Sequence, residues 1–445
     1  MRIIIAGAGE VGTHLAKLLS RENIDITLLD EKQERLGTLE TNYDILEKVG
    51  NPTSIQDLKD CGIQNADLFI AVTPDENTNM TACILANRLG AKKTLARIDN
   101  YEYLLEENRT FFKDLGLTHL IYPEMLAANE ICESLKTNWL RYHISLSNGA
   151  LELCVVKIRE GAEVIGKRFD SGYYSHGRYR IVAIKRGNQT LIPTGADEVE
   201  VEDVVYVVCI REEMDFLRTQ MGKTEREMKH IFFIGGSRIA QKAIQQLPDN
   251  MSITVIEPDK EICYKLSEKL GNALIINADG SDMETLREEG IQDADAVVAV
   301  AAKSETNIFA CLAAKRFGVR KTIAEVENID YIPMAEGLDI ETVLNKKTIT
   351  ASYIYQMLLD ASVLNVRNLT NADAQVVEFQ AKEGSKITRD IIKELDLPKQ
   401  ANIGGIVRAG EGVLVNGETQ VLPGDKVVVF CKSEIIRQLD KFFKD

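Results

Sequence analysis

Short apolar runs alternate with helical periodicity from the first residues of the chain. Residues 3–6 (IIIA) form a continuous apolar run, which is typical of a parallel strand buried on both faces, and residues 14–19 (HLAKLL) carry the helical period. The alternation continues with strands predicted at 24–29, 67–73 and 94–98 and a helix at 77–89. Strands that alternate with helices predict a doubly wound α/β sheet.

This pattern occurs twice. A shift of 228 residues aligns the segment at 62–100, which reads GIQNADLFIAVTPDENTNMTACILANRLGAKKTLARIDN, without a gap with the segment at 290–328, GIQDADAVVAVAAKSETNIFACLAAKRFGVRKTIAEVEN. Upstream, IIIAGAGEVG at 3–12 aligns with IFFIGGSRIA at 231–240. The chain therefore contains an internal duplication, and each copy is expected to fold as its own unit.

A weaker repeat lies behind each of these segments, where IVAIKRG at 181–187 resembles GGIVRAG at 404–410. Each half therefore consists of a Rossmann-like, doubly wound parallel-sheet N-module and a small, β-rich α+β C-module, with a charged linker between the halves. The C-modules are expected to act as dimer-forming scaffolds, and no motif marks a ligand in them. The predicted boundaries are 1–135, 140–215, 216–229 for the linker, 230–360 and 365–445.

Composition narrows the classes of function. The chain has 445 residues and a formal charge of −15, so broad binding to nucleic acid or anionic lipid is disfavoured. No apolar run approaches the ~20 residues of a membrane span, and the N-terminus does not read as a signal peptide. The eight cysteines form no C-x-x-C pair and are expected to be reduced and buried, and no metal site is predicted.

The candidate chemistry lies in the turn after the first strand. Gly7 permits the tight turn, Gly9 lets the backbone approach a pyrophosphate, and Gly12 lets the helix pack on the strand. Asp30 ends the second strand, where its carboxylate can accept hydrogen bonds from ribose hydroxyls and would repel a 2′-phosphate. The pattern predicts dinucleotide or adenine-nucleotide binding, with NAD(H) favoured over NADP(H); the alternative is a glycine turn that only preserves the fold. The motif residues are Gly7, Ala8, Gly9, Glu10, Val11 and Gly12.

The second copy departs from this pattern. Its turn begins at Gly235, but Ser237 places a side chain where the closest approach is needed, and Ala240 replaces the packing glycine. Glu257 keeps an acid at the ribose position. Nucleotide binding in repeat 2 is therefore left open, and Arg238 fits either a phosphate contact or a solvated side chain.

Several enzyme signatures are missing from the sequence. It contains no Tyr-x-x-x-Lys pair, Walker A motif, G-x-S-x-G or H-E-x-x-H. A nucleotide site without such chemistry indicates a sensor rather than an enzyme. Two alternatives remain, an NAD-dependent oxidoreductase and a redox-sensing transcriptional regulator; the charge of −15 and the lack of a helix-turn-helix pattern disfavour the second.

The whole duplicated pattern resembles the TrkA family, which is built from RCK (KTN) domains. The residues that carry the resemblance are GAGEVG at 7–12, LLD at 28–30, the segment 50–73, LARIDN at 95–100 and YPEMLAA at 122–128. The resemblance implies a cytoplasmic ring, peripheral on the inner face of the plasma membrane, that gates a potassium-translocating subunit of the TrkH or TrkG type. It also implies a homotetramer whose N-modules bind NAD(H), or ATP and ADP at the same sites.

Position by position, the resemblance adds nucleotide contacts. Asn51 stands where the family usually has an aspartate that contacts the adenosine, whereas Asp279 keeps that acid in repeat 2. Val72 and Thr73 end the strand that would border the adenine. Arg97 would face the phosphates.

Two acidic positions also draw attention through the resemblance. Glu325 replaces Arg97 in repeat 2, and this charge reversal disfavours a polyphosphate there. Glu124 lies where related rings approach a divalent cation or a neighbouring subunit, although a plain surface glutamate fits equally well.

Overall fold

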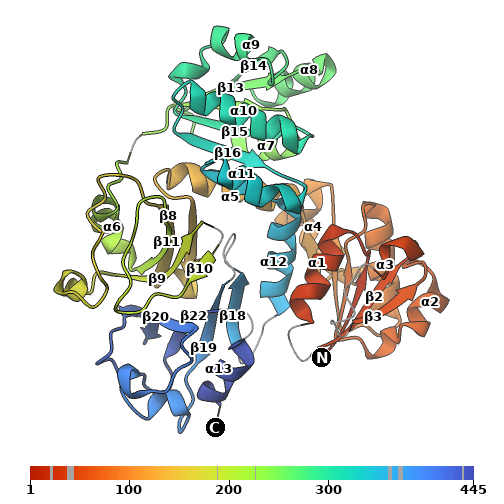
Figure 1. Cartoon of the computed structure of the whole chain (residues 1–445). Coiled ribbons are helices and arrows are strands. Elements are labelled where there is room, and N and C mark those ends of the chain that lie inside the picture. Colours follow the sequence, from red (N-terminus) through yellow and green to blue (C-terminus); the bar gives the residue numbers. More distant parts are fainter. Residues whose placement is uncertain are drawn as a thin grey trace.

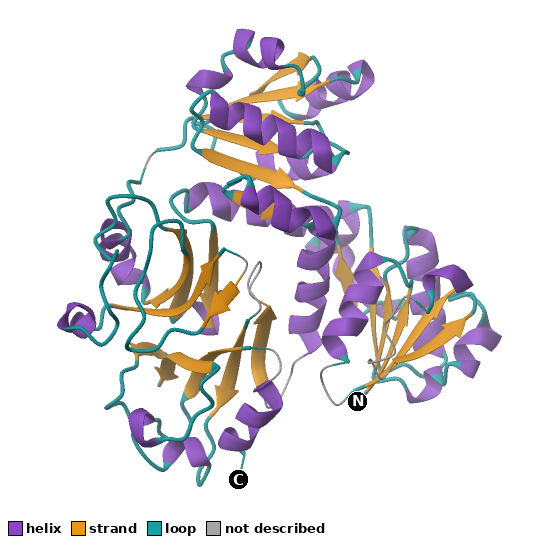
Figure 2. Ribbon diagram, in the orientation of Figure 1, coloured by secondary structure: helices purple, strands orange, loops and turns teal. Residues whose placement is uncertain are grey.

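The computed structural model describes residues 1–20, 24–37, 45–187, 189–225, 227–358, 363–368, 374–432 and 435–444. The described chain forms two six-stranded parallel sheets and two five-stranded antiparallel sheets, which alternate along the sequence (Figure 1). The predicted fold class is confirmed: each Rossmann-like module is followed by a small antiparallel module (Figure 2).

The first parallel sheet has the strand order β3-β2-β1-β4-β5-β6. The strands are β1 (Arg2–Ala6), β2 (Asp25–Asp30), β3 (Ile45–Val49), β4 (Leu68–Ala71), β5 (Lys93–Arg97) and β6 (His119–Ile121). Four helices connect them: α1 (Glu10–Leu19), α2 (Ile55–Asp60), α3 (Glu76–Arg88) and α4 (Glu106–Asp114). Strands β2 and β4 flank β1 on opposite sides, so the direction of the strand order reverses at β1. This reversal creates a crevice at the carboxyl ends of β1 and β4.

The second parallel sheet repeats this order as β14-β13-β12-β15-β16-β17. The strands are β12 (His230–Ile234), β13 (Ser252–Glu257), β14 (Ala273–Asn277), β15 (Ala296–Ala299), β16 (Lys321–Glu325) and β17 (Thr342–Leu344). The helices are α7 (Arg238–Ile244), α8 (Lys260–Lys269), α9 (Met283–Glu288), α10 (Ser304–Arg316) and α11 (Ile332–Gly337). The register of the central strands is also repeated, because β1 pairs with β4 as β12 pairs with β15.

The two N-modules exchange a helix. Helix α5 (Pro123–Lys136) leaves the first sheet and packs on α7, where Ile131 and Leu135 join the core that contains Ile244. Helix α12 (Lys346–Leu358) leaves the second sheet and packs on α1, where Ile354 joins the core that contains Leu15. Each repeat therefore completes part of the other repeat's apolar core.

The C-modules form the other two sheets, in the orders β10-β9-β11-β8-β7 and β18-β19-β22-β20-β21. The first contains β7 (Tyr142–Leu146), β8 (Leu151–Lys157), β9 (Tyr179–Arg186), β10 (Gln189–Leu191), β11 (Val204–Cys209) and α6 (Met214–Gln220). The second contains β18 (Val363–Asn368), β19 (Gln375–Gln380), β20 (Ala401–Arg408), β21 (Glu411–Leu414), β22 (Lys426–Cys431) and α13 (Ile436–Phe443). Helix α6 covers the start of the predicted linker. It packs on the first C-module, where Leu217 is fully buried in the core.

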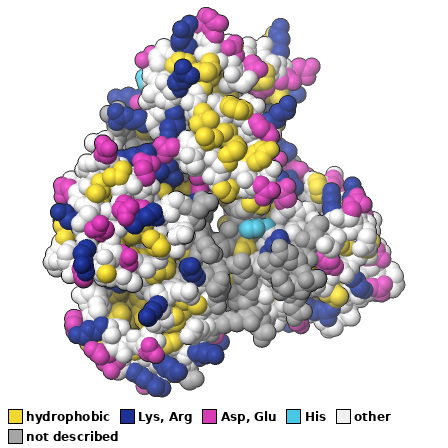
Figure 3. All heavy atoms as spheres, in the orientation of Figure 1, with side chains coloured by type: hydrophobic (Ala, Val, Ile, Leu, Met, Phe, Trp, Pro, Cys, Tyr) yellow, Lys and Arg dark blue, Asp and Glu magenta, His cyan; other side chains and the backbone are white. Residues whose placement is uncertain are grey.

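The surface carries charges of both signs, and the cysteines are mostly buried. Acidic and basic side chains are interspersed over the face shown in Figure 3. Seven cysteines are buried, as predicted, whereas Cys263 is partly exposed, and all eight are free thiols. Among the described residues, no helix combines the length and apolarity needed to cross a membrane.

Candidate functional site

The glycine loop between β1 and α1 has three distinct positions. Gly7 has a φ of +108°, and a Cβ there would lie 3.0 Å from the backbone nitrogen of Thr73. A Cβ at Gly12 would lie 1.9 Å from the carbonyl oxygen of Gly7, so helix and strand pack too closely for a side chain. A Cβ at Gly9 would meet nothing within 4 Å, which leaves open space at the start of α1.

Asp30 ties this loop to the end of β2. The carboxylate is 5% exposed, and its Oδ2 accepts a hydrogen bond from the N–H of Ala8 at 2.7 Å. Its Oδ1 accepts from the N–H of Lys32 at 2.9 Å, and the Arg35 guanidinium lies 3.5 Å from Oδ2. A carboxylate offers about four acceptor positions, so Asp30 keeps capacity for a ribose hydroxyl while it holds the loop.

A cleft of about 200 Å³ opens at this point, at the carboxyl ends of β1 and β4. Three predicted residues line it, namely Gly7, Asp30 and Thr73. The sequence prediction missed the other lining residues, which are Leu29, Glu31, Lys32, Arg35, Pro52, Pro74, Asp75 and Thr78. The volume is below the ~300–1,000 Å³ of typical ligand pockets, so a dinucleotide would extend beyond the cleft along the open start of α1.

The remaining residues predicted in repeat 1 surround this cleft. Val72 is 5% exposed at the end of β4. Asn51 precedes the lining residue Pro52, and its Oδ1 accepts a hydrogen bond from the N–H of Thr53 at 2.7 Å. Arg97 does not line the cleft; its guanidinium lies 3.1 Å from Oδ1 of Asp99.

Asn79 is a positioning residue that the site prediction did not include. It is fully buried, and its Oδ1 accepts two hydrogen bonds from Thr73, one from the backbone N–H at 2.9 Å and one from the side-chain hydroxyl at 2.7 Å. Its amide donates to the carbonyl oxygen of Arg97 at 3.0 Å, so it clamps the ends of neighbouring strands. Asn307 makes the equivalent bonds to Ala301 and to the end of β16, and this recurrence was the available signal.

Repeat 2 preserves part of this architecture. Gly235 has a φ of +96°, and the carboxylate of Glu257 accepts a hydrogen bond from the N–H of Gly236 at 2.7 Å, as Asp30 does in repeat 1. Asp279 accepts hydrogen bonds from the N–H and hydroxyl of Ser281, and these bonds hold the pKa of Asp279 below its usual value.

The second loop differs from the first in its side chains. Gly236 stands at the position of Ala8, and a Cβ there would lie 2.4 Å from the Cδ1 atom of Leu266. The hydroxyl of Ser237, at the position of Gly9, caps α7 by accepting a hydrogen bond from an N–H in its first turn. Arg238 is exposed and donates to the carbonyl oxygen of Asp99, in repeat 1, at 3.2 Å. The second loop therefore carries a side chain, bonded to its own helix, at the position where the first loop has Gly9.

Charged side chains of both repeats meet where the exchanged helices begin. Lys347 lies 2.7 Å from Glu10, and Lys346 lies 3.3 Å from Glu124. The reading of Glu124 as a plain surface residue is wrong, because α5 packs it into the interface with 3% exposure. Burial raises the pKa of Glu325, at the end of β16 and 5% exposed, to about 7.

These features define the chain as a tandem pair of Rossmann-type modules, the first with a cleft at its glycine loop, each joined to an antiparallel-sheet module. Residues 3–123 and 231–346 match the family model of the TrkA-N domain, and residues 154–222 and 376–444 match that of the TrkA-C domain. The chain belongs to the TrkA family, the RCK-domain proteins of potassium transport.

Relatives match along their full length. The Trk system potassium uptake protein TrkA of Haemophilus influenzae is 30% identical, over 100% of this chain and 99% of that protein. The TrkA homolog 1 of Methanosarcina mazei is 30% identical over 100% of both. Among solved structures, the GsuK RCK domain has a TM-score of 0.58 at 16% identity, covering 99% of this chain and 94% of that one. The GsuK channel bound to NAD has a TM-score of 0.57 at 16% identity, covering 99% and 78%; these two likenesses show the fold.

Proposed function

We propose that the chain is the regulatory subunit of a Trk-type potassium uptake system. It binds NAD(H), or ATP and ADP, in the cleft of repeat 1 and controls a membrane potassium-translocating subunit of the TrkH or TrkG type. The observation that carries the proposal is the open space at Gly9 beside the Asp30 carboxylate. The NAD bound to the GsuK channel makes NAD the first ligand to test.

The residues present fit a nucleotide on chemical grounds. The backbone N–H groups at the start of α1 have no side-chain cap, so they can donate to phosphate oxygens. Asp30 can accept from ribose hydroxyls, while Lys32 and Arg35 line the same cleft and add positive charge. These residues bind and orient the nucleotide, and the proposed role requires no reaction on it.

Control of a pore sets an energetic requirement. A ligand shifts an equilibrium only by its difference in affinity for the two shapes, and a shift from 1:99 to 99:1 takes about 5.5 kcal/mol. One weakly discriminating cleft cannot supply this, whereas several coupled copies can. We therefore propose a homotetrameric ring, held at the inner face of the plasma membrane through its partner, with modules at the boundaries predicted above.

Substitution of Gly9 tests the cleft. Gly9→Ala adds a methyl group to open space, so the fold should persist while nucleotide affinity falls at least tenfold, about 1.4 kcal/mol. Calorimetric titration of the full chain with NADH, NAD, ATP and ADP measures this, with Gly271→Ala, also free of contacts within 4 Å, as the matched control. Equal affinity of both variants for every nucleotide would place the binding site elsewhere.

Flux measurements test the regulatory role. Vesicles that contain a Trk-type translocating subunit should change their potassium flux when the chain and its nucleotide are added together, and the Gly9→Ala variant should weaken the nucleotide response. Flux that ignores both the chain and the nucleotide would refute the proposed function. Light scattering that shows a stable monomer at micromolar concentration would refute the ring.

A further inference from the structure

The two repeats carry opposite charges at equivalent positions of their shared interface. Glu10 is the first residue of α1, and Arg238 is the first residue of α7. Glu124 is the second residue of α5, and Lys347 is the second residue of α12. These positions are equivalent because each exchanged helix begins two residues after the last strand of its own sheet. Each acid of repeat 1 is therefore replaced by a base in repeat 2.

The charges are complementary at both helix contacts. Where α1 meets α12, Glu10 and Lys347 form an ion pair at 2.7 Å. Where α5 meets α7, Glu124 and Arg238 both act on the phenol of Tyr122. The pKa of this phenol is raised to about 12, by burial first and by Glu124 second, while Arg238 opposes the rise. An acid and a base thus flank each junction.

Pairing of identical repeats would destroy this complementarity. Two copies of repeat 1 would join α1 to α5 and set Glu10 against Glu124, which is only 3% exposed. Two copies of repeat 2 would join α7 to α12 and set Arg238 against Lys347. Like charges in these contacts disfavour association, more at the buried Glu124 than at Glu10, whose side chain is 53% exposed and screened by water.

The C-modules show a similar heterotypic contact. Arg180 lies opposite Val208 in the first sheet, and Asn402 lies opposite Phe430 in the second. Val208 and Phe430 each precede the cysteine that ends the strand, so Arg180 and Asn402 are equivalent residues. The strand register therefore moves the sequence alignment of 181–187 by one residue, from 404–410 to 403–409.

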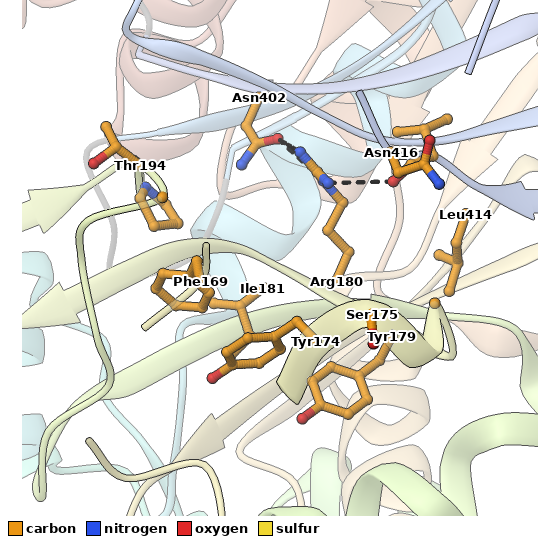
Figure 4. Close-up of a pocket in the computed structure, with 14 residues that line it drawn as sticks. Phe169, Tyr174, Ser175, Tyr179, Arg180, Ile181, Thr194, Asn402, Leu414 and Asn416 are labelled. Carbon is orange, nitrogen blue, oxygen red and sulfur yellow. Dashed lines mark hydrogen bonds between the residues drawn. The ribbon is translucent and has the colours of Figure 1, made fainter. Parts of the chain in front are cut away.

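These equivalent residues bond to each other beside a cavity of about 300 Å³ between the C-modules (Figure 4). The Arg180 guanidinium donates to Oδ1 of Asn402 at 2.9 Å and to the carbonyl oxygen of Val415 at 3.2 Å. Two copies of the first C-module would set two half-buried arginines against each other instead.

We propose that these contacts select the partner of each repeat: a repeat fits the other repeat of its own chain and rejects a second copy of itself. The surface is formed by α1, α5, α7 and α12 together with β9 and β20. Every paired unit then contains one loop with Gly9 and one with Ser237 at the equivalent position, never two of either kind. The inference concerns pairing alone and stands whether or not a nucleotide binds.

Carbodiimide cross-linking of the full chain tests the proposal, because it joins an amine directly to a carboxylate with loss of water. The unmodified chain should join Lys347 to Glu10 in a product of single-chain mass. The double variant Glu10→Lys/Arg180→Asn makes repeat 1 self-complementary. It should join the introduced lysine at position 10 to Glu124 in a product of double mass, at least fivefold above the unmodified chain.

Two further variants serve as a compensating change and as a control for this cross-linking experiment. Adding Lys347→Glu restores an attractive contact within the chain, and the high effective concentration of linked modules should return the product to single mass. Glu106→Lys/Arg180→Asn places the new lysine on exposed α4 and should leave the pattern of the unmodified chain.

A mirror variant covers the case in which the first does not fold. Arg238→Lys/Lys347→Glu makes repeat 2 self-complementary and should join the two introduced side chains in a product of double mass. The proposal is overturned if folded forms of these variants yield the joined peptides only at single mass, or at double mass no more often than the Glu106→Lys control does.

Discussion

Glu325 allows a quantitative test of how the repeats share charge. Its Oε1 is buried without a hydrogen-bond partner, and four charged side chains face it from three segments. Lys346 and Lys347 on α12 lower its pKa, whereas Glu327 after β16 and Glu124 on α5 raise it. Burial is the largest effect, so the pKa in the folded chain rises from 4.5 to about 7.

The sign of the pH effect follows from these two values. Below pH 4.5 both the folded and the unfolded chain hold the proton. Between pH 4.5 and 7 the unfolded chain releases it first, so the free energy of unfolding falls as the pH rises, and above pH 7 the loss is complete. At about 1.4 kcal/mol per pH unit, the loss is about 3 kcal/mol.

Substitution of Glu325 by glutamine should remove this loss. Urea unfolding of Glu325→Gln and of the unmodified chain, each at pH 5 and pH 8, should show that the variant gains about 2–3 kcal/mol relative to the unmodified chain at the higher pH. Glu327→Gln, which removes a neighbouring charge that is 46% exposed, controls for charge alone. An identical stability difference at the two pH values would refute the reasoning.

Four other substitutions have defined outcomes. Asp339 accepts hydrogen bonds from Arg159, Arg141 and Lys315. Burial raises its pKa, but Lys315 and Arg159 outweigh burial and hold the pKa at about 2. Asp339→Asn should therefore lower the free energy of unfolding by about 2 kcal/mol at pH 7, and the difference in stability between variant and unmodified chain should vanish as the pH falls from 3.8 to 2. Asn79→Ala leaves buried backbone groups unpaired and should cost about 2–4 kcal/mol, as should its equivalent Asn307→Ala, but only the first should weaken nucleotide binding. Gly12→Ala should lower the melting temperature by several degrees, because its Cβ meets a backbone oxygen; circular dichroism would detect this, and an unchanged melting curve would contradict the packing argument.

Local patterns were sufficient for the architecture of the N-modules. The continuous apolar runs at β1 and β12 predicted strands buried on both faces, and the gapless repeat predicted two copies of one sheet. The exchange of α5 and α12 was not predictable in this way. An apolar helix face shows that a partner exists but does not say which sheet supplies it, and both candidate sheets belong to the same chain.

Some residues of the candidate site could be predicted from the sequence and others could not. Gly7 and Asp30 were found because their roles depend on backbone geometry at fixed offsets from a strand, whereas Thr73 was found through the family resemblance. Lys32 and Arg35 were missed because nothing in their local pattern distinguishes a lining side chain from a solvated one. The contact of Leu266 with Gly236 joins the second loop to a helix about 30 residues further along the chain, so only tertiary structure reveals it.

Duplication within one chain changes what an interface between modules can contain. In a symmetric pair of identical modules, a residue on the axis must meet its own copy, so an arginine there would face an arginine. A fused pair removes this constraint, and Arg180 can face Asn402 while Glu10 faces Lys347. The same freedom allows one loop to keep open space at Gly9 while the other carries Ser237 at the equivalent position. The two loops can then differ in ligand binding although one fold builds both.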